Sequence, residues 1–150
     1  MRTMPTHKDI EPDLDINENE LKTLVEEWKT GKLKNLSTHL LGFVDRNRVE
    51  ILKLARNAKS PEKLVVAAQK FVRRRGYIHL PLDMADQIHE INNEIWYRGE
   101  IGDFDRQKIK ETWTVRHAPT WRRWRIKQIM FIIDQRASEV AAELLRPQAG

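Results

Sequence analysis

The spacing of apolar residues along this chain follows the period of an α-helix. Between residues 18 and 30, Leu21, Leu24, Val25 and Trp28 fall on one face, and apolar residues of residues 37–58 recur at spacings of three, four and seven. No region alternates with period two for long enough to predict a strand, and we find no internal repeat. The pattern predicts an all-α fold: a single-domain bundle of five or six helices with a long C-terminal helix.

Several helix ends carry local signals. Asn17 is a suitable N-cap with Glu20 as its capping-box partner, and Ser60 followed by Pro61 marks a second start. That helix is expected to end at Gly76, which can adopt the left-handed closing conformation. Further helices are expected over residues 82–98, from Asp103 or Asp105 to a break at Pro119, and over residues 120–145.

The last of these helices begins with the stretch TWRRWRIKQIMFIID. At about 100° per residue it carries two apolar faces. The main face runs its whole length and is expected to be core: Ile126, Ile129, Met130, Ile133, Ala137, Val140, Ala141 and Leu144. The second face is expected to be central in the bundle or covered by a partner, and we take it as a candidate partner-binding surface: Trp121, Trp124, Gln128, Phe131 and Ile132.

The segment NNEIWYRGE, at the end of the helix over residues 82–98, is a second candidate partner-binding region. It contains Trp96, Tyr97 and Arg98 beside a turn that contains glycine. Large amphipathic residues near a loop are typical of recognition surfaces. They are also typical of side chains that plug the end of a bundle, and we favour plugging.

Composition limits the domain organisation and the location. A chain of 150 residues is expected to form one domain, here over residues 16–146, after a flexible acidic arm over residues 1–15. The chain has no cysteine, which excludes disulfides and thiolate catalysis. No window approaches the roughly 18 apolar residues of a membrane span. We therefore expect a cytoplasmic protein with no membrane contact.

The charge is distributed unevenly. Residues 1–30 carry four basic and eight acidic side chains, a net of −4, whereas residues 31–150 carry 23 and 14, a net of +9. Such an excess favours a polyanionic partner, so nucleic-acid binding is an alternative function. The candidate cations for it are Arg73, Arg74, Arg75, Arg122, Arg123, Arg125 and Lys127. The last four scatter around the helical wheel, and the first three suit a helix C-terminus, so neither group indicates nucleic acid specifically.

One polar face could hold a metal ion. Asp86, His89 and Glu90 share the side of the helix over residues 82–98 that is opposite to Met84, Ile88, Ile91 and Ile95, which are expected to point inward. Carboxylate-bridged metal sites in bundles use such a pair on two helices, and here no second helix offers one. We therefore expect a solvated polar face, no metal and no cofactor.

Arg74 and His79, in the stretch RRGYIH, have the spacing of the arginine and histidine pair of HEPN-type ribonucleases. Those proteins are also all-α and of similar length. The resemblance covers six residues and would imply a ribonuclease, but Gly76 departs from the family pattern. Since arginine is abundant in this chain, chance explains the match better.

Three functions follow from these patterns. The first is a non-catalytic interaction protein that self-associates or docks on a protein partner. The second is a basic nucleic-acid-binding module. The third, which has the least support, is a metal-dependent or ribonuclease-like enzyme.

Overall fold

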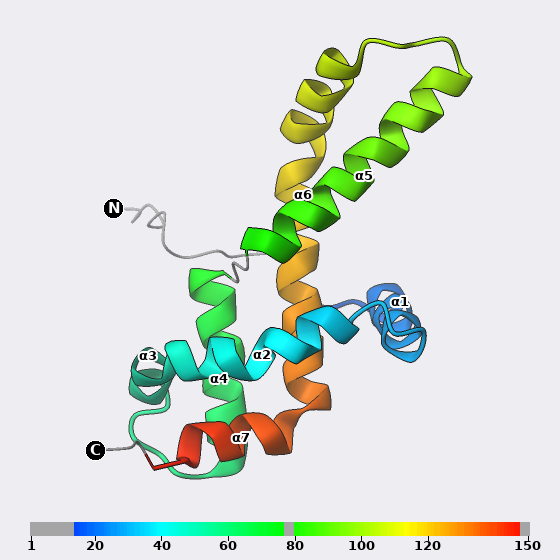
Figure 1. Ribbon diagram of the computed structural model, residues 1–150. Helices are drawn as coiled ribbons and strands as arrows, with labels where there is room; N and C mark the ends of the chain where they lie inside the picture. The colour runs from blue at the N-terminus through cyan, green and yellow to red at the C-terminus, as the bar shows by residue number, and fades with distance from the viewer. Residues whose placement is uncertain (1–13, 77–79, 148–150) are drawn as a thin grey trace, which may run out of the picture. The chain divides into compact units, whose positions relative to one another are not determined.

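The computed structural model describes residues 14–76 and 80–147, and it confirms the all-α class. The described residues contain no strand and form seven helices, more than the five or six expected. Figure 1 labels them: α1 (Glu18–Lys29), α2 (Lys34–Arg46), α3 (Arg48–Leu54), α4 (Pro61–Arg75), α5 (Leu80–Glu100), α6 (Arg106–Gln135) and α7 (Ala137–Leu145). None of the helices described is long and apolar enough to cross a membrane.

The described chain divides into two compact units. The first contains residues 14–76 and 126–147, and the second contains residues 80–125. The prediction of one domain over residues 16–146 stays a prediction. The predicted flexible arm lies outside the described residues except at its end, where Leu14 is fully buried and Asp15 pairs with Arg73. Leu14 and Asp15 therefore belong to the first unit.

Local helix signals at α1 and α4 are confirmed. The Asn17 side chain accepts a hydrogen bond from the Glu20 backbone, and the Glu20 carboxylate accepts one from the Asn17 backbone at 3.1 Å. In α4, Pro61 occupies the first turn and Gly76 closes the helix at φ +80°. These ends depend on neighbours within a few residues, which is why the sequence alone predicts them.

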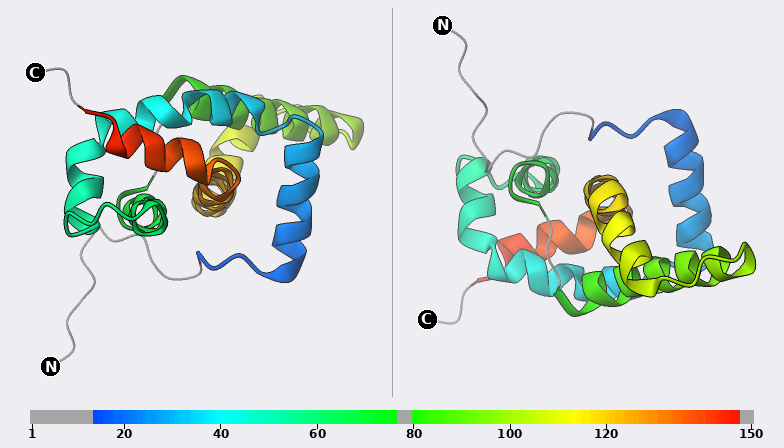
Figure 2. Two further views of the ribbon diagram at one scale, coloured as in Figure 1. Left: turned by 90° about the horizontal axis from the view of Figure 1, so that it is seen from below. Right: turned by 90° about the horizontal axis from the view of Figure 1, so that it is seen from above.

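The first unit buries its core between helices that the chain brings together from both of its ends. As Figure 2 shows, α7 packs against both α2 and α4, and α3 packs against α4. Seven of the eight residues on the predicted main face of the last helix are buried there, Ala137 being only half-buried. The core position of that face is confirmed.

Three expected helix boundaries are wrong. The helix expected over residues 37–58 is interrupted at Asn47, whose side-chain amide donates to the Phe43 carbonyl at 2.9 Å and so competes with the backbone. The helix expected over residues 120–145 ends at Gln135, because Arg136 adopts φ −114° and ψ 31°. Pro119, by contrast, does not break α6. A proline removes one intrahelical hydrogen bond and crowds the preceding turn, and α6 continues through it despite that cost.

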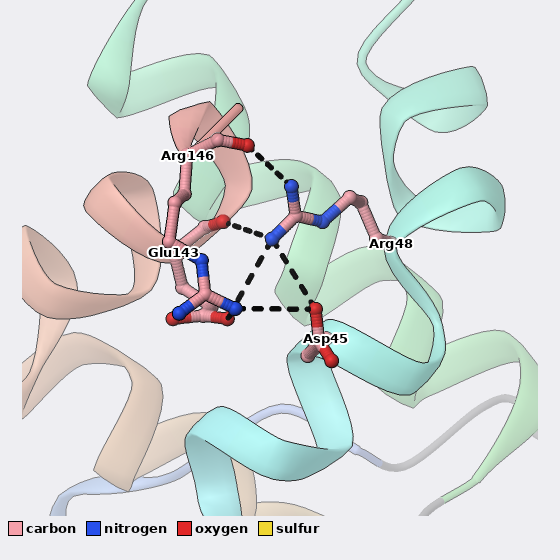
Figure 3. Close-up of polar contacts among 4 residues, drawn as sticks. All are labelled: Asp45, Arg48, Glu143 and Arg146. Carbon is pink, nitrogen blue, oxygen red and sulfur yellow. Dashed lines mark hydrogen bonds and ion pairs between the residues drawn. The ribbon is translucent and has the colours of Figure 1, made fainter. Parts of the chain in front are cut away.

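Arg48 lies buried beside the C-terminus of α7 (Figure 3). Its guanidinium donates to the Glu143 carbonyl at 2.7 Å and to the Arg146 carbonyl, and it pairs with the carboxylate of Asp45 at 3.3 Å. The last carbonyls of a helix have no intrahelical partner, so a cation there satisfies them. Arg48 therefore joins the start of α3 to the end of α7 and has a structural role.

Candidate functional site

The second unit is a helical hairpin made of α5 and residues 106–125 of α6, visible in Figure 1. The turn between the two helices uses Gly102 at φ +92°, a conformation that favours glycine. Asp105 then caps α6 by accepting a hydrogen bond from the Lys108 backbone at 3.1 Å, which confirms one of the two predicted caps. The hairpin carries the exposed candidate residues other than Arg75.

A buried arginine ties the two helices of the hairpin together. Arg125, on α6, lies with its Nε 3.1 Å from a carboxylate oxygen of Asp83, and it also binds the carboxylate of Asp86. The guanidinium stacks over the Trp121 ring at 4.6 Å. Asp83 and Arg125 are both buried, so the side of α5 that faces α6 is polar at this end.

That polar contact determines where the apolar side of α5 points. Met84, Ile88, Ile91 and Ile95 were expected to point inward, but Met84 is 57% exposed and Ile88 is 51% exposed. Ile91 and Ile95 are half-buried. The expectation was wrong for Met84 and Ile88 because Asp83, not the apolar stripe, faces the partner helix. We call these four residues the α5 stripe.

Large apolar side chains are exposed over much of the hairpin. Trp96 is 68% exposed, and Tyr97 beside it is also exposed, so these two residues do not plug the end of a bundle. Arg98 is half-buried and pairs with Glu94 at 2.8 Å. Further large apolar side chains exposed in this unit are Ile101, Phe104 and Val115.

The predicted second face of the last helix is divided between the two units. Gln128, Phe131 and Ile132 are buried in the first unit, where the Phe131 ring meets the Trp28 ring edge-on at 6.3 Å. Gln128 donates to the Glu27 carboxylate at 2.9 Å. Gln128 and Phe131 are covered by α1, and all three side chains are core residues that are not available to a partner. Trp121 and Trp124 belong to the hairpin and are half-buried.

The candidate cations do not form one continuous group. Lys127 is buried and binds the Glu20 carboxylate at 2.7 Å, Arg125 is buried against Asp83, and Arg73 pairs with Asp15 at 3.0 Å. Arg74 is half-buried, while Arg75, Arg122 and Arg123 are exposed. Three of the seven cations are thus already engaged with carboxylates of the same chain.

The candidate metal ligands are not brought together. Asp86 is bound to Arg125, and His89 and Glu90 are exposed on α5. In residues 14–76 and 80–147, no group of three His, Cys, Asp or Glu residues could hold a metal ion. His79, the second residue of the ribonuclease-like pair, lies outside the described residues.

A small cleft of about 280 Å³ opens inside the hairpin. Its walls carry both signs of charge, with the Glu94 and Arg98 pair on one side and Arg116 on the other. Trp113 lies buried at this cleft, with the His117 ring 5.9 Å from it. The volume is at the lower end for a small-molecule site.

Comparison of the chain with protein-family models, with curated proteins and with solved structures found no match. The function must therefore be argued from the geometry of the described residues.

Sequence reasoning found the four residues of the α5 stripe and assigned them to the core. The sequence also contains a signal that the stripe binds a helical partner. Residues 84, 88, 91 and 95 are spaced by four, three and four, which is the a and d spacing of a coiled-coil seam. A seam of this kind pairs with one helix, whereas a core-facing helix carries a wider apolar face. The narrow stripe favours a helical partner.

Proposed function

We propose that this chain is a non-catalytic interaction protein that docks on a protein partner through the α5 stripe. The observation that supports this most directly is the exposure of Met84 and Ile88 within an apolar row of coiled-coil spacing. Each side chain is about half exposed, so its complete burial would contribute about 1 kcal/mol. Trp96 and Tyr97 offer further apolar area at the same helix, as interface anchors commonly do.

The charge of the hairpin supports a protein partner over a polyanion. Residues 78–125 carry eight acidic and eight basic side chains, so the net charge of the hairpin is zero, and the excess of +5 belongs to the rest of the chain. A surface that binds nucleic acid is expected to gather cations along one side. Nucleic-acid binding through the hairpin is therefore the less supported alternative. A cytoplasmic location stays a prediction.

The proposal is tested by recovering partners of the full chain from its own cells. The double variant Met84→Glu/Ile88→Glu places two charges in the stripe, and Val49→Glu/Val66→Glu is its matched control, because those valines are 58% and 60% exposed in the first unit. Tagged chains are purified, and the bound proteins, including untagged copies of this chain, are quantified by mass spectrometry. We expect proteins that bind the unmodified and control chains to be lost from the stripe variant.

The same set of bound proteins on all three chains would contradict the proposal. Circular dichroism and thermal unfolding of each variant show whether a loss follows from unfolding. If Met84→Glu/Ile88→Glu fails to fold, the milder pair Met84→Gln and Ile88→Thr repeats the comparison.

A further inference from the structure

The α5 stripe has a symmetry that an identical helix would match. When two copies of α5 are laid antiparallel about a point between His89 and Glu90, position 84 meets position 95 of the other copy. Position 88 then meets position 91. Antiparallel coiled coils pair a positions with d positions in this manner. Every apolar residue of the stripe thus meets an apolar residue of an identical helix.

We propose that the partner of the α5 stripe is α5 of a second copy of this chain, packed antiparallel across a twofold axis. This inference rests on the proposed function and names the partner of that same surface. A twofold interface uses one patch on both copies, so the patch must be complementary to itself. The α5 stripe meets that condition.

The flanks of the stripe are also compatible with an identical partner. Ala85 and Asn92 flank it on one side, and Gln87 and Glu94 flank it on the other. Antiparallel packing places like flanks together, so Gln87 of each copy lies near Glu94 of the other and can donate to its carboxylate. The charge of Glu94 is already balanced by Arg98 at 2.8 Å. No like charges oppose one another beside the seam.

The direction of the stripe leaves room for a second helix. On an ideal helix, the side of α5 that carries Asp83, Gln87 and Glu94 lies about 80–90° from the middle of the stripe. The Asp83 side contacts α6 through Arg125. A second copy of α5 can therefore pack on the α5 stripe without displacing α6.

The size of the surface indicates a weak dimer. A helix of 21 residues is about 31 Å long and about 10 Å wide, so one side of α5 presents on the order of 300 Å². Two copies together bury on the order of 600 Å², which is the size of a transient, concentration-dependent interface.

The oligomeric state and the register are tested with the full chain. Sedimentation velocity at micromolar concentrations is expected to show a dimer for the unmodified chain and for Val49→Glu/Val66→Glu, and a monomer for Met84→Glu/Ile88→Glu. A monomer in all three chains up to about 100 µM would overturn self-association. If partner recovery still depended on the stripe in that case, docking would stand and only the identity of the partner would fail.

The chain has no cysteine, so disulfide trapping reports on the register directly. Met84→Cys and Ile95→Cys are made separately, mixed and oxidised, with Val66→Cys mixed with either as the control. We expect a disulfide between the two different variants, because the predicted register brings these positions together. Two copies of Met84→Cys alone should not link, since antiparallel packing separates them by about 16 Å along the axis. A link between two Met84→Cys chains, or none in the mixture, would overturn the antiparallel register.

Discussion

Arg125 and Asp83 form a buried ion pair that determines which side of α5 faces α6, with Nε of Arg125 3.1 Å from the carboxylate. A second carboxylate, that of Asp86, binds the same guanidinium. The polar contact inside the hairpin thereby leaves an apolar side outside it. A charged pair is an unusual centre for two packed helices, because its desolvation offsets much of its attraction. Its effect here is to orient α5.

Removal of Arg125 is expected to destabilise the hairpin. Arg125→Ala leaves Asp83 buried without its cation, and breaking one side of a buried pair costs about 3 kcal/mol. Hydrogen exchange measured by mass spectrometry should show faster exchange over α5 in this variant. Arg123→Ala, at an exposed neighbouring position, is the control and should leave exchange unchanged. Equal protection of α5 in both variants would show that the pair does not orient the helix.

Arg48 is expected to stabilise the first unit by a similar amount. Arg48→Ala removes the donors to the Glu143 and Arg146 carbonyls, so the free energy of unfolding should fall by about 3 kcal/mol. Arg48→Lys should recover little, because one ammonium cannot reproduce the planar guanidinium donors. Denaturant titration measures both, with the exposed Arg46→Ala as the control. If Arg48→Lys were as stable as the unmodified chain, the positive charge alone would account for the stabilisation, without the guanidinium geometry.

The ion pair between Glu20 on α1 and Lys127 on α6 should make the free energy of unfolding depend on pH. The hydrogen bond from Lys127 lowers the pKa of the Glu20 carboxyl below its ordinary value, partial burial opposes it, and the Asn17 backbone lowers it further. A carboxyl with a lowered pKa contributes stability at pH values above its unfolded pKa of about 4.3, and that contribution is lost as the pH falls through the folded pKa.

Glu20→Gln should therefore be less stable than the unmodified chain at pH 7, with the difference shrinking below about pH 4. Free energies of unfolding measured at both pH values check this. Glu26→Gln, at an exposed position of α1, should show no such trend. A difference that stays constant with pH would show that Glu20 does not act through its charge.

Pro119 offers a test of how α6 passes through a proline. The residue is exposed, and its ring removes one backbone donor and crowds the preceding turn. Pro119→Ala is expected to raise the free energy of unfolding by about 2 kcal/mol, since alanine restores the hydrogen bond. The same change at Pro61, in the first turn of α4, should have little stabilising effect because that donor has no helical partner. Similar effects at both prolines would contradict this explanation.

The sequence was sufficient where a structure depends on near neighbours. The Asn17 and Glu20 capping box and the Pro61 and Gly76 ends of α4 follow from residues one to four positions apart. The sequence was insufficient where contacts between residues far apart in the chain determine which side of a helix is buried. Nothing near α5 shows that Arg125 will bind Asp83, a partner 42 positions away, so the apolar side was assigned to the core.

The boundary at Arg136 could not be predicted for a related reason. Arg136 has an ordinary helical neighbourhood in sequence, and it leaves the helix while its guanidinium binds the Ser37 carbonyl, 99 positions away. The break at Asn47 is different, because its side chain binds the Phe43 carbonyl only four positions earlier. The two faces of the last helix were identified correctly in part. The sequence could not show that α1 covers Phe131 while Trp121 and Trp124 belong to another unit.

Footprinting of Met84 tests the docking proposal most directly. In dilute purified protein, mild peroxide should oxidise Met84 rapidly, and Met130, buried in the first unit, should react slowly. In protein oxidised within its cells, a partner on the α5 stripe should protect Met84 as strongly as Met130, as mass spectrometry of the two peptides would show. Equally rapid oxidation of Met84 in both settings would mean that no partner covers the stripe, and the proposed function would be wrong.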